Sequence, residues 1–218
     1  MLRRCERRHF DEENKKETAD RISYTHFDND ARKLCVLLSG TNYLYDKPLM
    51  YYTNMVMLQQ GYDVVQVNYA YEDSFFEQPV AGIAANILKD VKSVIVDVCQ
   101  RGAYDDILFV GKSLGTIPMS FHFSQKQAIH PKLIMLTPVL QTDDVYKKLL
   151  EIENELLLII GDADPHYDEQ KVATLNEKDN VTVLVIPNAN HSLDVVPNDM
   201  EQSLASLTKV MQRIRAFM

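Results

Sequence analysis

Runs of apolar residues alternate along the chain with segments in which apolar residues recur every three or four positions. Short runs rich in β-branched residues indicate strands, and the wider spacing indicates helices with one apolar face. The pattern predicts strands at residues 21–27, 33–38, 64–69, 106–110, 132–136, 156–160 and 181–186. It predicts helices at residues 48–60, 83–98, 114–127, 142–152, 169–175 and 198–217.

Two glycines and an asparagine mark the expected helix ends. Gly61 stands where a helix needs a left-handed residue to stop, and Gly102 can end the next helix. Asn198 is expected to cap the last helix, with Glu201 at the third position of a capping box. Residues 21–27 alternate as in a strand with one face toward solvent, whereas residues 33–38, which include Cys35, are apolar throughout and indicate a buried strand.

Strands separated by helices are not joined by hairpins, so the order of elements predicts a mostly parallel sheet covered on both sides. We therefore expect an α/β fold, with one three-layer doubly wound domain over residues 1–218. Residues 1–20 are the polar amino-terminal segment of this domain. In such sheets ligands bind at the carboxyl ends of the strands.

Composition narrows the class of protein further. The 23 Lys and Arg against 31 Asp and Glu give a net charge of −8, which disfavours binding to nucleic acid. The polar start of the chain does not resemble a secretory signal, and no apolar run approaches the roughly 18 residues of a membrane span. Three separated cysteines without a CxxC pair fit reduced thiols, so we expect a cytoplasmic protein that does not bind membranes.

The strongest local signal is the sequence Gly111-Lys112-Ser113-Leu114-Gly115, between a predicted strand and a predicted helix. This is the G-x-S-x-G pattern of a nucleophile elbow, in which small flanking residues allow a turn so sharp that the serine hydroxyl stands free. The same residues resemble the end of a phosphate-binding loop, but that loop needs a glycine five residues before Gly111, where the chain has Asp106. We therefore favour a serine nucleophile.

A serine nucleophile needs a base and an acid that orients the base, on loops after later strands. The strand at 156–160 runs into residues 161–165, Gly-Asp-Ala-Asp-Pro, and the last strand runs into residues 187–192, Pro-Asn-Ala-Asn-His-Ser. Both loops stand where the chain order of nucleophile, acid and base requires them.

From about residue 30 onward the chain resembles the α/β-hydrolase superfamily of serine hydrolases, in particular small esterases and dienelactone-hydrolase-like proteins. The resemblance implies that Ser113 is the nucleophile, His191 the general base and acid, and Asp164 the residue that orients the imidazole. Asp162 and Asp168 stay open as the acid if Asp164 only caps the following helix. His166 is the rival base, although it lies close in sequence to the acid.

The resemblance also implies an oxyanion hole made by the amide of Leu114 and an amide from residues 39–42, Ser-Gly-Thr-Asn. Many relatives begin this loop with His-Gly rather than Ser-Gly, which leaves Thr41 and Asn42 as the two choices. We prefer Thr41 because it directly follows the glycine.

Several aromatic residues border the expected site and are candidate pocket walls, although half of such residues serve only packing. We expect Asn42, Tyr43, Phe75 and Phe76 to contact substrate, with residues 70–82 as a small flap without regular structure. The other candidates are Tyr45 and Tyr69.

The interval between Ser113 and Asp164 has room for two helices and two strands but not for a multi-helix cap. We therefore expect a hydrolase with an open site for a small or medium soluble ester or thioester, acting through an acyl-enzyme. No metal-ligand motif is present, and the expected chemistry needs no cofactor or metal. A peptidase or acyltransferase would use the same residues, and a non-catalytic ligand-binding or scaffold protein is the alternative from another class; the oligomeric state stays open.

Overall fold

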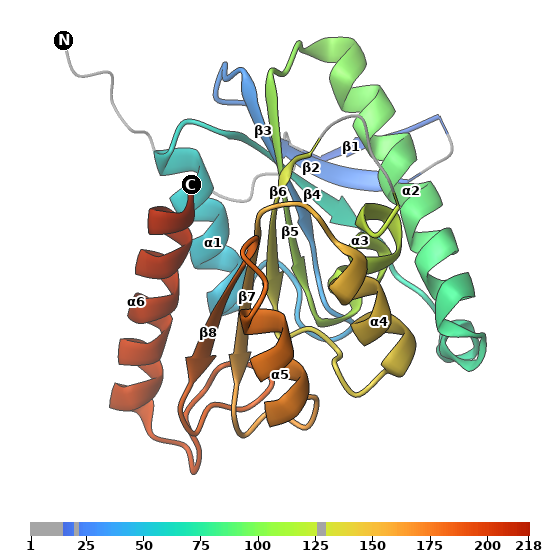
Figure 1. Ribbon diagram of the computed structural model, residues 1–218. Coiled ribbons are helices and arrows are strands. Elements are labelled where there is room, and N and C mark those ends of the chain that lie inside the picture. The colour runs from blue at the N-terminus through green and yellow to red at the C-terminus, as the bar shows by residue number, and fades with distance from the viewer. Residues whose placement is uncertain (1–14, 20–21, 126–129) are drawn as a thin grey trace, which may run out of the picture.

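The computed structural model describes residues 15–19, 22–125 and 130–218. In it the chain is built around a single mixed sheet (Figure 1). The eight strands follow the order β1-β2-β4-β3-β5-β6-β7-β8. The strands are β1 (Lys15–Glu17), β2 (Ser23–Phe27), β3 (Lys33–Leu38), β4 (Asp63–Asn68), β5 (Asp106–Lys112), β6 (Lys132–Leu136), β7 (Leu156–Gly161) and β8 (Val181–Ile186). The helices are α1 (Pro48–Gln59), α2 (Val80–Arg101), α3 (Thr116–Phe123), α4 (Asp143–Glu151), α5 (Glu169–Asn176) and α6 (Met200–Phe217), with short 3₁₀ turns η2 (Asp73–Glu77) and η3 (Ser113–Gly115).

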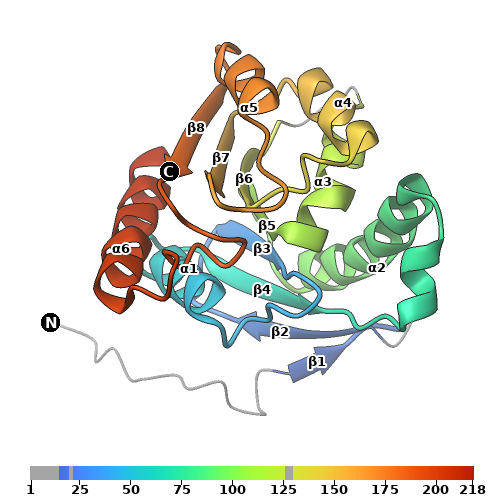
Figure 2. The ribbon, with the colours of Figure 1, turned by 90° about the horizontal axis from the view of Figure 1, so that it is seen from below.

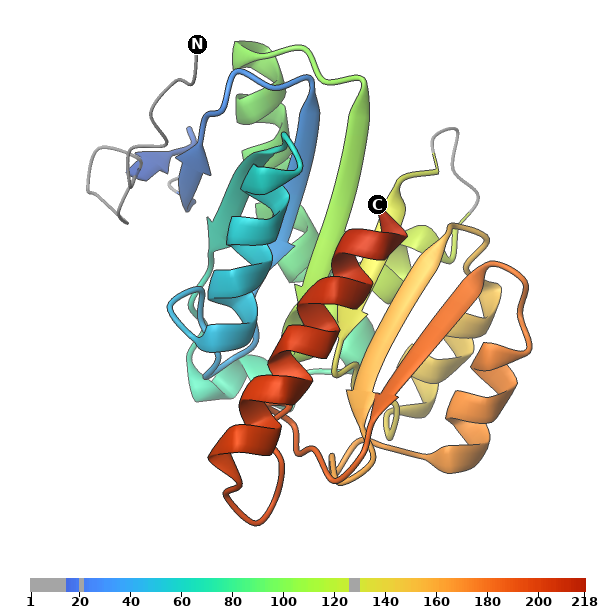
Figure 3. The ribbon, with the colours of Figure 1, turned by 90° about the vertical axis from the view of Figure 1, so that its left-hand side faces the viewer.

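All pairings from β4 across the sheet to β8 are parallel, so the predicted three-layer α/β fold is confirmed. The helices α1 and α6 cover one face of the sheet, and α2 to α5 cover the other (Figures 2 and 3). Each face has its own apolar core, because strands buried on both sides contribute alternate residues to the two layers.

The amino-terminal edge of the sheet differs from the expectation. β2 runs antiparallel to both β1 and β4, and β1 lies inside the segment that its sequence marks only as polar. The expected solvent-facing side of β2 is wrong, because Tyr24 packs under α2 while Phe27 joins the core beneath α1. Thr25 and His26 between them are buried as well.

Helix boundaries follow local chemistry, with two corrections. Gly61 adopts the expected left-handed conformation, at φ 78°, just after α1. The cap of α6 is Asp199 rather than Asn198, because the Asp199 side chain accepts the amide hydrogen of Gln202. The helix expected at 114–127 is split into η3 and α3 and ends at Phe123; residues 126–129 lie outside the described part.

The strands β3 and β5 are neighbours at the topological switch point of the sheet, where the strand order reverses, so the loops that follow them lie beside each other. Figure 2 views the carboxyl ends of the parallel strands, where these loops meet those after β7 and β8. In the described residues no helix is long and apolar enough to cross a membrane.

Candidate active site

Ser113 occupies a strained turn between β5 and α3. Its φ of 52° places a non-glycine residue in the left-handed region, which costs about 1 kcal/mol or more. The turn closes because the flanking glycines have no side chain: a Cβ on Gly115 would lie 2.3 Å from the carbonyl oxygen of Leu38, and one on Gly111 would lie 2.6 Å from that of Gly115. The spacing of the two glycines is thus a requirement of this backbone.

The structure brings Ser113, His191 and Asp164 together from three separate loops. The Ser113 Oγ lies 2.8 Å from Nε2 of His191, and Nδ1 of the same ring lies 2.8 Å from Oδ2 of Asp164. A neutral imidazole that donates from Nδ1 to the carboxylate accepts the serine proton at Nε2. These are the contacts that a serine nucleophile, its base and an orienting acid require.

Burial and hydrogen bonding fix the charge state of Asp164. Its side chain is fully buried, and Oδ1 accepts the amide hydrogen of His166 at 2.8 Å. Burial alone raises the pKa of Asp164, but the hydrogen bonds from His191 and from the amide of His166 outweigh it and lower the pKa below the usual value. Asp164 is therefore an ionised acceptor for the imidazole at neutral pH.

The two other carboxylates considered for this position are engaged elsewhere. Oδ1 of Asp162 accepts the amide hydrogen of Asn188 at 2.5 Å and so joins the loops after β7 and β8. Asp168 caps α5 by accepting the amide hydrogen of Lys171 at 3.0 Å. Of the three, Asp164 contacts the imidazole.

Gly161 sets how closely the acid and base loops approach. A Cβ at this glycine would lie 2.0 Å from the carbonyl oxygen of Ala189, which also accepts the amide hydrogen of Ala163 at 3.1 Å. Because these loops carry Asp164 and His191, the contact fixes the distance between the two side chains.

The loop after β3 lies directly against the nucleophile. A Cβ on Gly40 would come within 3.3 Å of the Ser113 Cβ, and the amide of Gly40 closes the loop by donating to the Tyr43 carbonyl at 3.2 Å. Thr41 and Asn42 at the tip are exposed. No described residue accepts a hydrogen bond from the amide of Thr41, so this donor faces no competing protein acceptor.

Tyr45 and Tyr69, considered as pocket walls, hold this loop in place. The hydroxyl of Tyr45 is buried, lies 2.8 Å from the Leu37 carbonyl and 2.7 Å from the Val67 carbonyl so that its one hydrogen can be donated to either, and accepts the amide hydrogen of Ser39 at 3.2 Å. The Tyr69 hydroxyl donates to the Ser39 carbonyl at 2.6 Å. Both tyrosines therefore anchor the backbone that precedes Gly40.

The expected flap has regular structure, contrary to the prediction. Residues 73–77 form η2, and α2 begins at Val80 rather than at Ile83. Phe75 stacks on Tyr71 with ring centroids 3.8 Å apart, and Phe76 meets Phe75 edge-on at 5.4 Å. Both phenylalanines are half-buried against the core below α2, so this segment is a packed aromatic wall.

His166 lies beside the three site residues but outside their hydrogen-bonded chain. Its ring meets that of His191 edge-on, with centroids 5.1 Å apart. Its Nδ1 is buried without a hydrogen-bond partner among the described residues, and burial together with the nearby His191 lowers its pKa. His166 therefore borders the site as a neutral ring.

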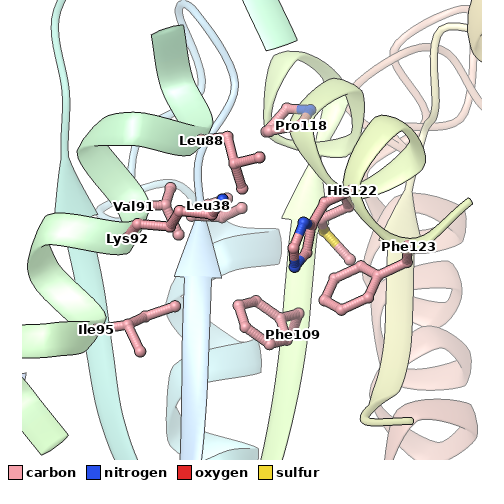
Figure 4. Close-up of a pocket in the computed structure, with 10 residues that line it drawn as sticks. Leu38, Leu88, Val91, Lys92, Ile95, Phe109, Pro118, His122 and Phe123 are labelled. Carbon is pink, nitrogen blue, oxygen red and sulfur yellow. The ribbon is translucent and has the colours of Figure 1, made fainter. Parts of the chain in front are cut away.

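An apolar groove lies behind the nucleophile turn, between α2 and α3 (Figure 4). Its lining includes Leu38, which a side chain on Gly115 would strike, and Met119, which a side chain on Gly111 would strike. Figure 4 shows Leu88, Val91 and Ile95 of α2 facing Pro118, His122 and Phe123 of α3 across it.

The sequence alone does not reveal the surroundings of Lys112, which stands there only as part of a resemblance to a phosphate-binding loop. The structure buries this lysine at the end of β5, with contacts to both loops that flank Ser113. Its burial could have been inferred from its position, because Lys112 follows Leu108 and Val110 on the same side of the strand. In the described chain no group of three His, Cys, Asp or Glu side chains could hold a metal ion.

Comparison with known structures finds proteins of the same fold. The chain aligns with the esterase Pf2001 of Pyrococcus furiosus at 16% identity and a TM-score of 0.68, over 93% of this chain and 89% of that one. It aligns with Est1E of Butyrivibrio proteoclasticus at 14% identity and a TM-score of 0.71, over 94% and 97%. An alpha-beta serine hydrolase homologue from Coxiella burnetii gives 14% identity and a TM-score of 0.66, over 93% and 94%.

At such identities these likenesses concern the fold. Among curated proteins no relative is detected by sequence. The family described as "Alpha/beta hydrolase domain" matches residues 31–218, which include the nucleophile turn and the loops that carry Asp164 and His191. The chain therefore belongs to the alpha/beta hydrolase family.

Proposed function

We propose that this protein is a serine hydrolase that cleaves a small or medium soluble carboxylic ester or thioester through an acyl-enzyme. The observation that carries the proposal is the hydrogen-bonded chain from Ser113 through His191 to the buried Asp164, at the carboxyl edge of the sheet. A cytoplasmic location, expected from the sequence, is part of the same proposal.

The proposed reaction uses only groups of the chain. His191 Nε2 takes the Ser113 proton as Oγ attacks the acyl carbon, and Asp164 stabilises the imidazolium that results. The amides of Leu114 and Thr41 donate to the oxyanion. His191 then protonates the alcohol or thiol as it leaves the acyl carbon. Water next attacks the acyl carbon while His191 takes a proton from it, and His191 returns that proton to Ser113 Oγ as the acid product leaves.

The surroundings of the site favour a substrate of modest size. The segment between Ser113 and Asp164 is occupied by α3, β6, α4 and β7, which belong to the sheet and its cover. Thr41 and Asn42 are exposed next to Gly40, which lies against the nucleophile, and η2 carries the edge-on pair Phe75 and Phe76. Asn42, Tyr43, Phe75 and Phe76 remain our candidates for contact with the acyl or leaving group.

A panel of p-nitrophenyl esters from acetate to decanoate, with matched thioesters, tests the proposal. We expect turnover by the wild type and a loss of at least about 10⁴-fold in kcat for Ser113→Ala. The matched control is Ser124→Ala at the end of α3, whose hydroxyl donates to the Phe121 carbonyl within the same helix turn and whose loss should leave kcat unchanged. Folded wild type without activity toward the panel would favour the non-catalytic binding protein instead.

A further inference from the structure

Lys112 directly precedes Ser113 and is the last residue of β5. Its side chain is 1% exposed and follows Leu108 and Val110 on the face of the sheet under α1 and α6. Burying a lysine is costly unless its ammonium group is well partnered. No carboxylate among the described residues forms an ion pair with it, so its partners lie elsewhere.

The Lys112 ammonium contacts both loops that complete the site. Nζ donates to the backbone carbonyl of His191 at 3.1 Å, which holds the base loop. The same Nζ lies 4.7 Å from the centroid of the Tyr43 ring, within range of a cation–π interaction. The Lys112 Cδ fills the space beside Gly40, where an added Cβ would lie 3.2 Å away.

Tyr43 itself is fixed by the start of α1. Its hydroxyl accepts the amide hydrogen of Leu49 at 3.1 Å, and its carbonyl accepts that of Gly40. The ring that receives the ammonium is thus a rigid part of the loop that bears Thr41. One side chain therefore connects the nucleophile strand to the backbone of the base and to the proposed oxyanion loop.

We propose that Lys112 is a positioning residue that clamps the His191 and Tyr43 loops onto the strand carrying Ser113, and so sets the geometry between nucleophile, base and oxyanion donor. The proposal rests on the proposed hydrolase function. Burial lowers the pKa of Lys112 to about 8, with the charge of Asp164 opposing the shift, so the group is an ammonium at neutral pH. Its charge strengthens both contacts.

Lys112→Met tests the clamp because it keeps an unbranched side chain of similar length while removing the donor and the charge. Misplacing reacting groups by about 1 Å can cost about 10²-fold in rate. We expect kcat per titrated active site to fall about tenfold or more, with KM for p-nitrophenyl acetate changed less than about threefold. Lys89→Met, at an exposed position of α2, is the matched control and should behave as wild type.

Active-site titration separates positioning from stability. If Lys112→Met lowers only the melting temperature or the fraction of titratable sites, while kcat per site stays at the wild-type value, the proposal is overturned. If Lys112→Met does not fold, Lys112→Leu, which likewise lacks the donor and the charge, takes its place with the same measurements and the same criteria.

A readout independent of activity keeps this proposal distinct from the hydrolase proposal. The ¹⁵N shifts of the His191 ring report its tautomer and hydrogen bonding, and we expect Lys112→Met to change them while Lys89→Met does not. If wild type lacks esterase activity, the hydrolase proposal fails, yet changed His191 shifts would still support the clamp. Unchanged His191 shifts in Lys112→Met would contradict it.

Discussion

Asp164 and Asp162 are two residues apart in the sequence, yet their surroundings give the two carboxylates different roles. Asp164 is 4% exposed and faces the imidazole, whereas Asp162 is exposed and bonds the backbone of the next loop. Identity and position in the sequence leave both as candidates. The difference arises from the turn after β7, which directs one carboxylate inward and the other along the loop.

Replacing each carboxylate by its amide should separate these roles. Asp164→Asn removes the acceptor that selects the imidazole tautomer, so we expect kcat to fall about 10³–10⁴-fold at neutral pH. Asp162→Asn should change kcat less than about tenfold, because its side chain acts on loop backbone alone. Steady-state kinetics on one short ester decides; equal losses in both variants would contradict the assignment of the acid.

Lys112 predicts a rise in stability at alkaline pH. Its pKa is about 8 in the folded chain and 10.5 ordinarily, so between these values the unfolded state binds more protons. The free energy of unfolding then increases with pH across this window. Below and above the window the contribution of Lys112 to this free energy does not change with pH. Relative to Lys112→Met, the wild type should gain up to about 3 kcal/mol between pH 8 and 10.5 in urea titrations. A constant difference across the window would show that the folded pKa is not lowered.

At the scale of elements, close backbone contacts between loops hold the site. The carboxyl ends of β7 and β8 approach at Gly161, and those of β3 and β5 approach at Gly40 and Gly115. The contacts at Gly161 and Gly115 exclude a side chain and the one at Gly40 leaves little room for one, so the distances among the three site residues depend on the glycines as well as on the strands.

Gly161→Ala should therefore damage catalysis through the backbone. Its Cβ would strike the Ala189 carbonyl, and relief requires the acid and base loops to separate. We expect a loss of about 2–4 kcal/mol in unfolding free energy and at least about 10²-fold in kcat. Gly102→Ala is the control, since Gly102 has the extended backbone that alanine adopts readily and its Cβ would come no closer than 3.2 Å to its nearest neighbour, the Tyr104 side chain. Wild-type kinetics in folded Gly161→Ala would refute the role of this contact.

The aromatic wall of η2 is the element expected to select the acyl group. Replacing Phe75 and Phe76 together by Ala removes the apolar surface that we propose borders the site and should shift the preferred ester length by two or more carbons, read from kcat/KM across the ester panel. Tyr51→Ala with Tyr52→Ala, an edge-on pair at 5.3 Å on α1, is the matched control. Unchanged selectivity in the η2 variant would remove this segment from the binding site.

At the scale of the whole molecule, the pattern of apolar runs was enough to predict the layers and the parallel sheet, whereas the three side chains of the site were predicted from the nucleophile motif and the family resemblance. Buried strands such as β3 and β7 can be recognised from their local run of apolar residues, and the nucleophile turn requires Gly111 and Gly115. The order of loops along the chain then indicated Asp164 and His191.

Features that depend on distant contacts were not predictable in this way. The burial of β2 is decided by α1 and α2, and the choice of Asp199 over Asn198 as cap depends on how the chain enters α6. The surroundings of Lys112 required three loops to be placed at once. Long-range packing, rather than local preference, determines each of them.

Covalent labelling with a fluorophosphonate tests most directly whether Ser113 is an activated nucleophile. We expect intact-mass and peptide analysis to show one phosphonyl group on Ser113 of the folded wild type, slower labelling of His191→Ala, and none at this position in Ser113→Ala. Folded wild type that stays unlabelled, or Ser113→Ala that reacts as fast as the wild type, would contradict the account.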